Sequence, residues 1–469
     1  MAGRRTGSAT ELLVDLRRDR SIPLHRQLEH ELRAAVRAGR LSAGSVLPST
    51  RALARQLGLS RGVIVEAYEQ LVAEGYLVSR AGGTTTVAAR AAGPTTATVA
   101  GRDRREHRLD FRYGRPDVTQ FPRAAWLRSL RRVLTEAPSE RLSYLDRRGS
   151  LELRTALAEY LNRVRGTAAD PDRMVICNGF AQALFLLTQV LRTTGRRRLA
   201  VEVPGVQDVV YTASQTGVRL VRIEVDEAGL DVGALARTDA DAVLVTPAHQ
   251  FPTGAVLAPD RRAGIIAWAT AHDRLILEDD YDAEFRYDRE PIGALHGLAP
   301  EQVIYAGSAS KTLAPGLRLG WLLVPERLVD HFAAAKEATD RGSASLEQLA
   351  FADFLGRGEF DHHLRRMRPI YRRRRDAMLD ALRRHLPGAR PVGASAGLHI
   401  LAWLPDGVDE AALVRGAAAR GVGVDGMAPY HGGRGGPPGL LLGYGTLTVP
   451  AIEEGIRILG SVAASSRPS

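Results

Sequence analysis

Lysine is almost absent from this chain, whose 64 basic side chains are arginines except for Lys311 and Lys336. A lysine amine can lose its proton and condense with an aldehyde, whereas an arginine guanidinium stays protonated and cannot. Lys311 ends the segment Ser-Ala-Ser-Lys at 308–311, between two predicted strands. Lys311 is therefore a candidate Schiff-base residue, with an ordinary surface lysine as the alternative. Lys336 lies in a helical pattern and is predicted to be a surface residue.

Acidic residues follow an apolar segment upstream of Lys311. Residues 275–277 (Leu-Ile-Leu) have the pattern of a buried strand, and Glu-Asp-Asp-Tyr-Asp follows at 278–282. Ligands of open α/β sheets bind at the carboxyl ends of the strands, where a carboxylate can pair with a protonated pyridine nitrogen and a tyrosine hydroxyl can meet a ring oxygen. An acid of this run together with Tyr281 could therefore bind a cofactor such as pyridoxal phosphate (PLP), with a solvated acidic loop as the alternative.

Two further segments could bind a phosphate group. The loop after Lys311 reaches Arg318, whose guanidinium can pair with a phosphate or form an ordinary salt bridge. The predicted strand at 174–176 leads through Gly179 into an apolar helix that begins at Phe180 and Ala181, and amides at a helix N-terminus bind anions. Without the other motifs, this second segment would be a plain strand-to-helix turn.

From about Asp110 to the C-terminus these motifs resemble fold-type-I aminotransferases, large α/β proteins that use PLP. The resemblance implies that Lys311 forms the Schiff base, that Asp279 pairs with the pyridine nitrogen and that Tyr281 donates to the ring oxygen. In that family a tyrosine corresponding to Tyr144 reaches the phosphate in the neighbouring subunit, which implies a homodimer. The implied phosphate ligands are Ser308, Ser310, Arg318 and the turn of Gly179, Phe180 and Ala181.

The first ninety residues have a different organisation. Apolar residues at helical spacing predict a helix that begins near Leu24 and is closed by Gly39. Ser49 is predicted to cap a short second helix, and Ser60 to cap a third helix with an apolar inner face. Two short strands, at 75–80 and 85–87, are predicted to follow. This order predicts a winged helix-turn-helix with a β-wing.

A winged helix-turn-helix binds duplex DNA with its second motif helix in the major groove. Arg61 and Gly62 stand at the exposed start of that helix, so Arg61 is placed for a base edge or a phosphate, and Arg51 for the DNA backbone. A small helical domain with solvated arginines is the alternative. The stretch resembles the GntR family, apart from Gly62 and Val63, where hydroxyl residues are common. The predicted DNA-binding residues are Ser49, Arg51, Ser60, Arg61, Gly62 and Gly83 of the wing loop.

Charge and composition agree with this division. Residues 1–109 hold 18 Lys or Arg against 10 Asp or Glu, so most of the net charge of +11 lies on the predicted DNA-binding end. The predicted domains are 1–89 for the winged helix-turn-helix, 90–109 for a linker and 110–469 for the aminotransferase-like domain. Hydrophobic residues make up 45% of the 469, enough for a large core.

Some classes of protein and site are disfavoured. No apolar run approaches the roughly 18 residues needed to span a membrane, so a cytoplasmic protein is expected. The single cysteine, Cys177, cannot form an internal disulfide. His362 and His363 are adjacent but have no nearby ligands, which predicts surface residues and no metal site.

Joined in this order, the two halves resemble MocR-type regulators, the GntR subgroup with an aminotransferase-like effector domain. The motif Thr-Pro-Ala-His-Gln-Phe-Pro at 246–252 is similar to that subgroup. The resemblance implies that PLP, alone or with a small amine or amino acid, controls DNA binding without full transaminase activity. A genuine aminotransferase carrying a DNA-binding domain, and a DNA-binding protein with a cofactor-free scaffold, are the alternatives.

Two departures from the aminotransferase pattern bear on activity and effector. Phe251 stands where an aminotransferase places an asparagine beside the cofactor ring, which disfavours full catalysis. Residues 440–442 are leucines where many relatives carry an arginine for a substrate carboxylate, and Arg434 is the nearest replacement. An unpaired carboxylate would bind poorly. We therefore expect PLP itself, or an unusual amine, to be the signal, and expect control of vitamin B6 supply if PLP is.

Overall fold

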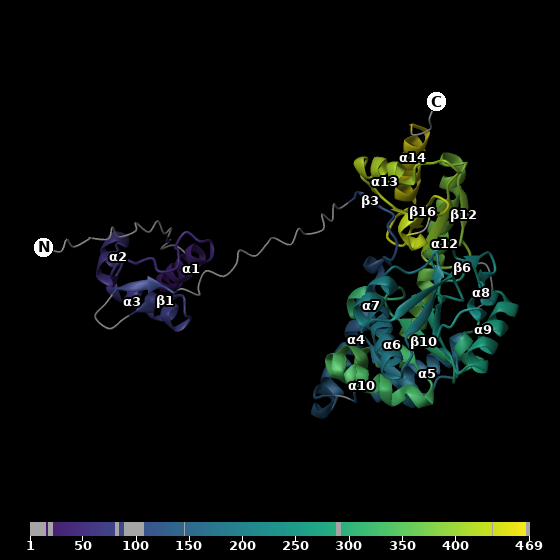
Figure 1. Cartoon of the computed structure of the whole chain (residues 1–469), viewed down its shortest axis with the longest axis horizontal. Helices are drawn as coiled ribbons and strands as arrows, with labels where there is room; N and C mark the ends of the chain where they lie inside the picture. Colours follow the sequence, from purple (N-terminus) through teal and green to yellow (C-terminus); the bar gives the residue numbers. More distant parts are fainter. Residues whose placement is uncertain are drawn as a thin grey trace. The chain divides into compact units, whose positions relative to one another are not determined.

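The computed structural model describes residues 16, 22–79, 84–88, 107–144, 146–287, 292–433 and 435–465. By its internal contacts the chain forms two compact units, residues 1–105 and residues 106–469. Figure 1 colours the first unit purple and the second from blue to yellow.

The small unit is a winged helix-turn-helix, as predicted. It contains α1 (Leu24–Arg37), α2 (Thr50–Leu57), α3 (Arg61–Ala73), β1 (Leu77–Ser79) and β2 (Thr85–Val87). The three helices bury one apolar face each, and the wing strands pair antiparallel with Leu77 opposite Val87. The apolar inner face predicted for this third helix is formed by Ile64, Ala67, Tyr68 and Leu71, which are all buried.

The two serine caps behave differently. The Ser49 hydroxyl accepts a hydrogen bond from the amide of Ala52 at 3.2 Å, so this predicted cap of α2 is confirmed. Gly58, at a φ of 62°, closes the same helix in the left-handed region that favours glycine. Ser60 occupies the cap position of α3, but its side chain makes no capping hydrogen bond, so only the position was predicted correctly.

The large unit is built on an eight-stranded mixed sheet with the order β4-β11-β10-β9-β8-β5-β6-β7. Strands β11 and β7 run antiparallel to their neighbours, and the remaining pairs are parallel. Near-continuous apolar runs form the central strands because both faces of the sheet are covered. The strands are β4 (Met174–Cys177), β5 (Arg198–Val203), β6 (Arg219–Asp226), β7 (Gly229–Leu230), β8 (Ala242–Val245), β9 (Leu275–Asp280), β10 (Val303–Ser308) and β11 (Gly320–Leu323).

Alternate side chains of these strands enter different apolar clusters. Val175, Leu199 and Leu277 pack with the leucines of α6, whereas Val243 and Ile276 pack with α9. The sheet is therefore wound on both sides, as in α/β folds with ligands at strand ends. The helices of this part are α4 (Arg123–Glu136), α5 (Leu151–Arg165), α6 (Phe180–Thr193), α7 (Asp208–Thr216), α8 (Val232–Ala236), α9 (Pro259–Ala271), α10 (Val329–Asp340), α11 (Ser345–Gly356) and α12 (Glu359–His385).

A second, four-stranded sheet follows, in the order β12-β13-β16-β15. Its strands are β12 (Arg390–Val392), β13 (His399–Trp403), β15 (Asp425–Gly426) and β16 (Gly439–Gly443), accompanied by α13 (Glu410–Ala419) and α14 (Val449–Ser465). Strand β3 (Leu109–Asp110) pairs with β14 (Val422–Gly423), so paired structure of the large unit already includes Leu109, the last residue of the predicted linker.

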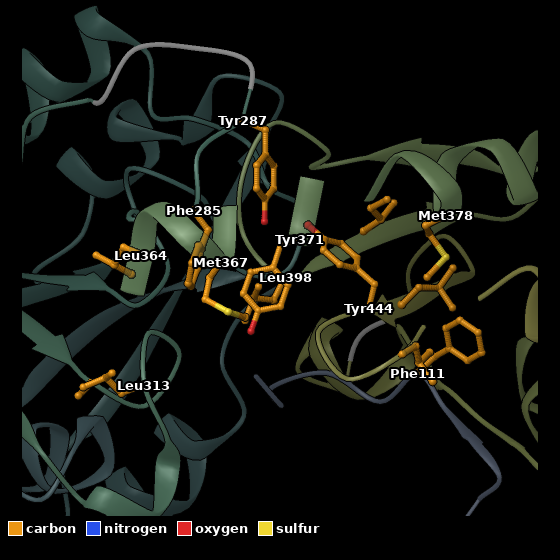
Figure 2. Packing of buried hydrophobic residues seen from close by; sticks show 14 of the residues in the cluster. Phe111, Phe285, Tyr287, Leu313, Leu364, Met367, Tyr371, Met378, Leu398 and Tyr444 are labelled. Atoms are coloured by element: carbon orange, nitrogen blue, oxygen red, sulfur yellow. The ribbon is translucent and has the colours of Figure 1, made fainter. Parts of the chain in front are cut away.

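An aromatic cluster joins the two sheets (Figure 2). The rings of Phe285 and Tyr371 pack edge to face with their centres 5.0 Å apart, beside Met367 and Leu398. The hydroxyls of Tyr287 and Tyr444 both donate to the carbonyl of Gly397 at 2.7 Å. This cluster fixes the segment around Gly397, which packs against the candidate site. Among the described residues, no helix is long and apolar enough to cross a membrane.

Candidate cofactor cavity and DNA-binding surface

A cavity of about 410 Å³ lies where β9 and β10 end. Because carboxyl ends of neighbouring parallel strands share one edge of a sheet, residues far apart in sequence meet there. The cavity is lined by eight of the ten predicted cofactor residues: Asp279, Tyr281, Ser308, Ser310, Lys311, Arg318, Phe180 and Ala181. Gly179 lies beside it, against Arg318, and Tyr144 lies elsewhere.

Three of the four acidic residues around β9 are fully engaged in the fold. The carboxylate of Glu278 accepts two backbone amides, at 2.9 and 3.0 Å. Asp280 forms a buried ion pair with Arg165 at 2.7 Å, and Asp282 contacts the ring of His249 at 2.9 Å. All four acids are buried, so the alternative of a solvated acidic loop is wrong. Burial of Glu278, Asp280 and Asp282 is tolerated because each of these three has a specific partner.

Asp279 is the exception. No hydrogen bond to its carboxylate is found within the described part of the chain, although only 7% of the residue is exposed and it lines the cavity. Burial, reinforced by the negative charges of Asp280 and Asp282, raises its pKa well above the ordinary value, and the charge of Lys311 lowers it only in part. A cation in the cavity would remove this penalty, and a protonated pyridine nitrogen is such a cation.

The surroundings of Lys311 favour a reactive, neutral amine. Its Nζ donates to the carbonyl of Gly114 at 2.8 Å and lies 4.9 Å from the centre of the Tyr113 ring. Burial lowers the pKa of Lys311, against the raising effect of Asp282 and Asp279. A lowered pKa increases the fraction of neutral amine, the form that attacks an aldehyde.

Lys336 shows what a structural lysine looks like in the same fold. It is completely buried in α10, and its Nζ contacts both carboxylate oxygens of Asp340 at 2.6 Å and the hydroxyl of Ser343 at 3.0 Å. The prediction of a surface lysine was therefore wrong. An acid one helical turn later neutralises the charge, which permits burial.

The part of the cavity beside the start of α6 is suited to a phosphate. Arg318, at a φ of 52°, donates to the carbonyl of Asn178 and lies against Gly179. Gly179 has a φ of 87°, a backbone conformation that favours glycine. Phe180 and Ala181 begin α6, where amides have no intrahelical acceptor. The hydroxyls of Ser308 and Ser310 line the same cavity.

Tyr281 is held by a buried ion pair. Its hydroxyl donates to the carbonyl of His249 at 3.0 Å. The His249 ring faces acceptors at both nitrogens, Asp282 Oδ2 at 2.9 Å and the carbonyl of Gly393 at 3.2 Å. Burial lowers the pKa of His249, but the Asp282 carboxylate outweighs it and the pKa is raised. The pair of His249 and Asp282 thus lies directly beside the Tyr281 hydroxyl, and the predicted contact of Tyr281 with a ring oxygen stays a prediction.

His249, Asp282 and His399 offer three buried ligand atoms within 4.8 Å of one another. Their packing favours an ion pair over a metal site, because a Cβ on Gly397 would lie 2.2 Å from Asp282 and little room remains.

The adjacent histidines His362 and His363 have different environments. His362 is exposed, but His363 is buried and contacts the carbonyl of Thr312 at 2.9 Å, so the surface prediction was wrong for His363.

The small unit carries a separate charged surface. Arg51 and Arg61 are exposed at the starts of α2 and α3, as is Gly62, and the two guanidiniums form no ion pair with any residue of the described range 22–79. By contrast, Arg33 is held by Glu74 at 2.7 Å and is therefore part of the fold. Unpaired arginines at helix starts are available to phosphates and bases. Gly83, predicted in the wing loop, lies outside the described residues.

Comparison with known proteins identifies the family of each unit and of the whole chain. Residues 24–87 match the gntR family of bacterial regulatory proteins, and residues 109–415 match aminotransferase class I and II. The probable rhizopine catabolism regulatory protein MocR of Rhizobium meliloti is 33% identical over 475 aligned residues, covering 96% of this chain and 95% of that protein. The chain belongs to the MocR subgroup of GntR-family transcriptional regulators.

Other relatives of this MocR-type regulator repeat the pattern. The pyridoxine biosynthesis transcriptional regulator PdxR of Corynebacterium glutamicum is 32% identical, covering 91% of this chain and 92% of that protein. Among solved structures, Pyrococcus horikoshii kynurenine aminotransferase covers 78% of this chain and 92% of its own at 25% identity and a TM-score of 0.72. LysN, the α-aminoadipate aminotransferase of Thermus thermophilus, covers 76% and 92% at 28% identity and a TM-score of 0.69. The predicted α/β fold and two-part architecture are confirmed.

Several lining residues of the MocR-type cavity were not predicted. Tyr113 packs against Phe251 at 4.7 Å, and Tyr430 against the same ring at 5.6 Å. Asp208 and Gly114 also line the cavity. Tyr113 lies three residues after Asp110, where the resemblance to aminotransferases begins, so that start of the resemblance was the signal that could have found it. Tyr430 and Asp208 lie in segments with no motif to mark them.

Tyr144 does not reach the cavity within its own chain. It is 84% exposed and lines a separate surface hollow of about 1040 Å³ with Arg147, Arg148 and Arg341. An exposed aromatic beside arginines suits an interface. The role predicted for Tyr144, contact with the phosphate of a neighbouring subunit, needs a second chain and stays a prediction.

Proposed function

We propose that this MocR-type regulator binds PLP in the 410 Å³ cavity and duplex DNA through α3, and that PLP changes its DNA-bound arrangement. The unpartnered, buried carboxylate of Asp279 is the observation that carries the proposal, because its neighbours Glu278, Asp280 and Asp282 all have partners among the described residues. A cationic ring nitrogen bound in the cavity would supply the partner that this buried carboxylate lacks.

Each residue has a distinct role in this proposal. PLP supplies an aldehyde for an amine and an electron-withdrawing ring when it is bound. Lys311 presents the amine, Asp279 holds a proton at the ring nitrogen, and Tyr281 redirects its hydroxyl proton from the carbonyl of His249 toward the ring. Arg318 orients the phosphate from the α6 end together with Ser308, Ser310 and the first amides of the helix.

Sustained transaminase turnover is not part of the proposal. Phe251 packs on Tyr113 and occupies the position where an aminotransferase carries an asparagine, so one hydrogen bond to the ring is lost. At most a residual half-transamination is expected. Two chains are expected to form a homodimer, with Tyr144 reaching the phosphate site of the partner.

The controlled process is proposed from a relative. PdxR of Corynebacterium glutamicum is named for regulation of pyridoxine biosynthesis, and its 32% identity extends over 91% of this chain. We expect PLP to bias one of two arrangements of the DNA-binding units, which requires different PLP affinities in the two arrangements. Control of vitamin B6 supply follows if PLP alone is sufficient.

Footprinting on the DNA upstream of the protein's own gene and the adjacent gene tests the proposal. The full-length chain and Lys311→Met are each examined with and without added PLP. The footprint of the unaltered chain is expected to appear, move or tighten with PLP, and that of Lys311→Met to be insensitive. A footprint that is the same under all four conditions would contradict the proposal that PLP is the signal.

A further inference from the structure

The cavity contains one more carboxylate than bound PLP would pair with. Its described lining contains two acids, Asp279 and Asp208, and two cations, Lys311 and Arg318. In the proposed function PLP engages Asp279 through its ring nitrogen, Lys311 through its aldehyde and Arg318 through its phosphate. Asp208 is then left facing the cavity without a cation.

Asp208 acts on the reactive end of the cavity. It is the first residue of α7, it is exposed, and no hydrogen bond or ion pair joins its side chain to the described residues. Burial lowers the pKa of Lys311, and Asp208 is one of three carboxylates that oppose this effect. An acid in the first turn also stabilises a helix, but that role does not require it to line a cavity.

A carboxylate-bearing effector finds no free cation among the described lining residues. Arg318 is fixed at the phosphate end by the carbonyl of Asn178. Leu440, Leu441 and Leu442 form the centre of β16 and are completely buried in the core. An amino acid bound with its amine near Lys311 would therefore place its carboxylate close to the like charge of Asp208.

The remaining walls suit an alkylammonium group. Tyr113, Phe251 and Tyr430 form a continuous aromatic surface, with ring centres 4.7 and 5.6 Å apart along the series. The Lys311 ammonium already lies over the Tyr113 face at 4.9 Å. Aromatic faces attract cations, and they pack against methylene groups.

We infer that the cavity takes a small aliphatic diamine as its effector, with one amino group at Lys311 and the second, as an ammonium, at Asp208. This inference rests on the proposed function, because PLP must occupy the other charged groups. It names an effector class that differs from amino acids only in the charge of the distal group.

Three probes of matched length test the effector class: putrescine, n-butylamine and γ-aminobutyrate, which end in an ammonium, a methyl and a carboxylate. Each is titrated calorimetrically into the PLP-loaded full-length protein. Putrescine is expected to bind about tenfold more tightly than n-butylamine, since a charge pair that bound PLP and the aromatic walls partly shield from water supplies that factor, and γ-aminobutyrate is expected to bind most weakly.

Two variants assign the preference to Asp208. Asp208→Asn is expected to remove the tenfold advantage of putrescine, whereas Asp208→Glu keeps it. Glu227→Gln removes one negative charge from an exposed site on the same unit and is expected to leave the ranking unchanged. The melting temperatures of the three variants are measured as a check on folding. Only Asp208→Asn is expected to change the ranking of the probes, and an unchanged melting temperature would show that this change reflects binding.

Each other result overturns the inference. Equal or tighter binding of γ-aminobutyrate, binding of none of the probes, or a putrescine preference that survives Asp208→Asn contradicts the diamine class. In these cases PLP absorbance and the PLP-dependent footprint persist, so the proposed function stands. If no Lys311-dependent visible absorbance develops with PLP, the proposed function fails and the inference fails with it.

Discussion

The charged groups of the small unit and those of the cavity have different surroundings. Arg51 and Arg61 are exposed and unpaired among the described residues, whereas Asp279 is buried and Lys311 half-buried among groups that form hydrogen bonds or ion pairs within the fold. An exposed arginine contributes to DNA affinity with little effect on folding. A buried charge affects the free energy of unfolding through its neighbours as well as ligand binding. Variants should therefore separate affinity from stability in the small unit, and should combine them around the cavity where the replaced group belongs to a buried ion pair.

The two lysines give the largest expected difference. Lys311→Met is expected to abolish the visible absorbance of bound PLP and every PLP-dependent change, without loss of stability, because it removes a half-buried charge that has no ionic partner among the described residues. Lys336→Met is expected to keep the absorbance and to lower the free energy of unfolding by about 1–3 kcal/mol, because Asp340 loses its cation. Absorption spectra and denaturation curves check both expectations, and Lys336-dependent absorbance would contradict the assignment.

The ion pair behind Tyr281 is expected to combine stability with binding. His249→Asn leaves the Asp282 carboxylate buried without its cation, which should cost about 3–5 kcal/mol of unfolding free energy at pH about 6. The folded pKa of His249 is raised above its ordinary 6.5. Its stabilisation is therefore fully present below the unfolded pKa and is lost as pH rises through the folded pKa. The deficit of the variant should therefore shrink as the pH rises above 6.5 through the raised pKa of His249.

Tryptophan fluorescence can follow this unfolding, because all four tryptophans lie in the large unit. His362→Asn is the matched control, since His362 is exposed, and it should leave the denaturation midpoint unchanged at every pH. A deficit in His249→Asn that grows with pH would show that the His249 ring is neutral in the folded protein.

Arg61 tests the expectation that exposed charges of the small unit affect DNA affinity without affecting stability. Arg61→Ala is expected to weaken specific DNA binding by about 1–3 kcal/mol and to reduce the salt dependence by about one counterion, with PLP absorbance and stability unchanged. Arg131→Ala, which removes an exposed arginine from α4 of the large unit, is the control. Fluorescence anisotropy at several salt concentrations measures both quantities. A stability loss in Arg61→Ala would end the distinction between the two regions.

The sequence predicts the small unit well because its determinants are local. Caps, turn glycines and apolar spacing lie within a few residues of what they specify, and Ser49 is confirmed as a cap. The absence of a capping hydrogen bond from the described Ser60 was not predictable, because the residue type fits the position equally well in both cases.

The cavity was predicted from its motifs but not from its surroundings. Residue type cannot separate Asp279 from Asp280, because the difference lies in Arg165, an ion-pair partner from α5. Tyr430 reaches the cavity from a distant segment without any periodic pattern. Lys336 was misjudged because its burial depends on an ion pair in the folded helix. Tertiary partners, rather than local propensity, determine these positions.

The two serine caps provide the smallest effect and the finest test within the small unit. Ser49→Ala is expected to destabilise α2 by about 1 kcal/mol, because it removes an existing hydrogen bond to Ala52, whereas Ser60→Ala should cost only a few tenths of that in α3. Hydrogen exchange in the full chain, followed on peptides from α2 and α3, measures each helix separately. Equal effects would mean that Ser60 caps α3 in solution, and that the local determinants of the DNA-binding surface are the same in both helices.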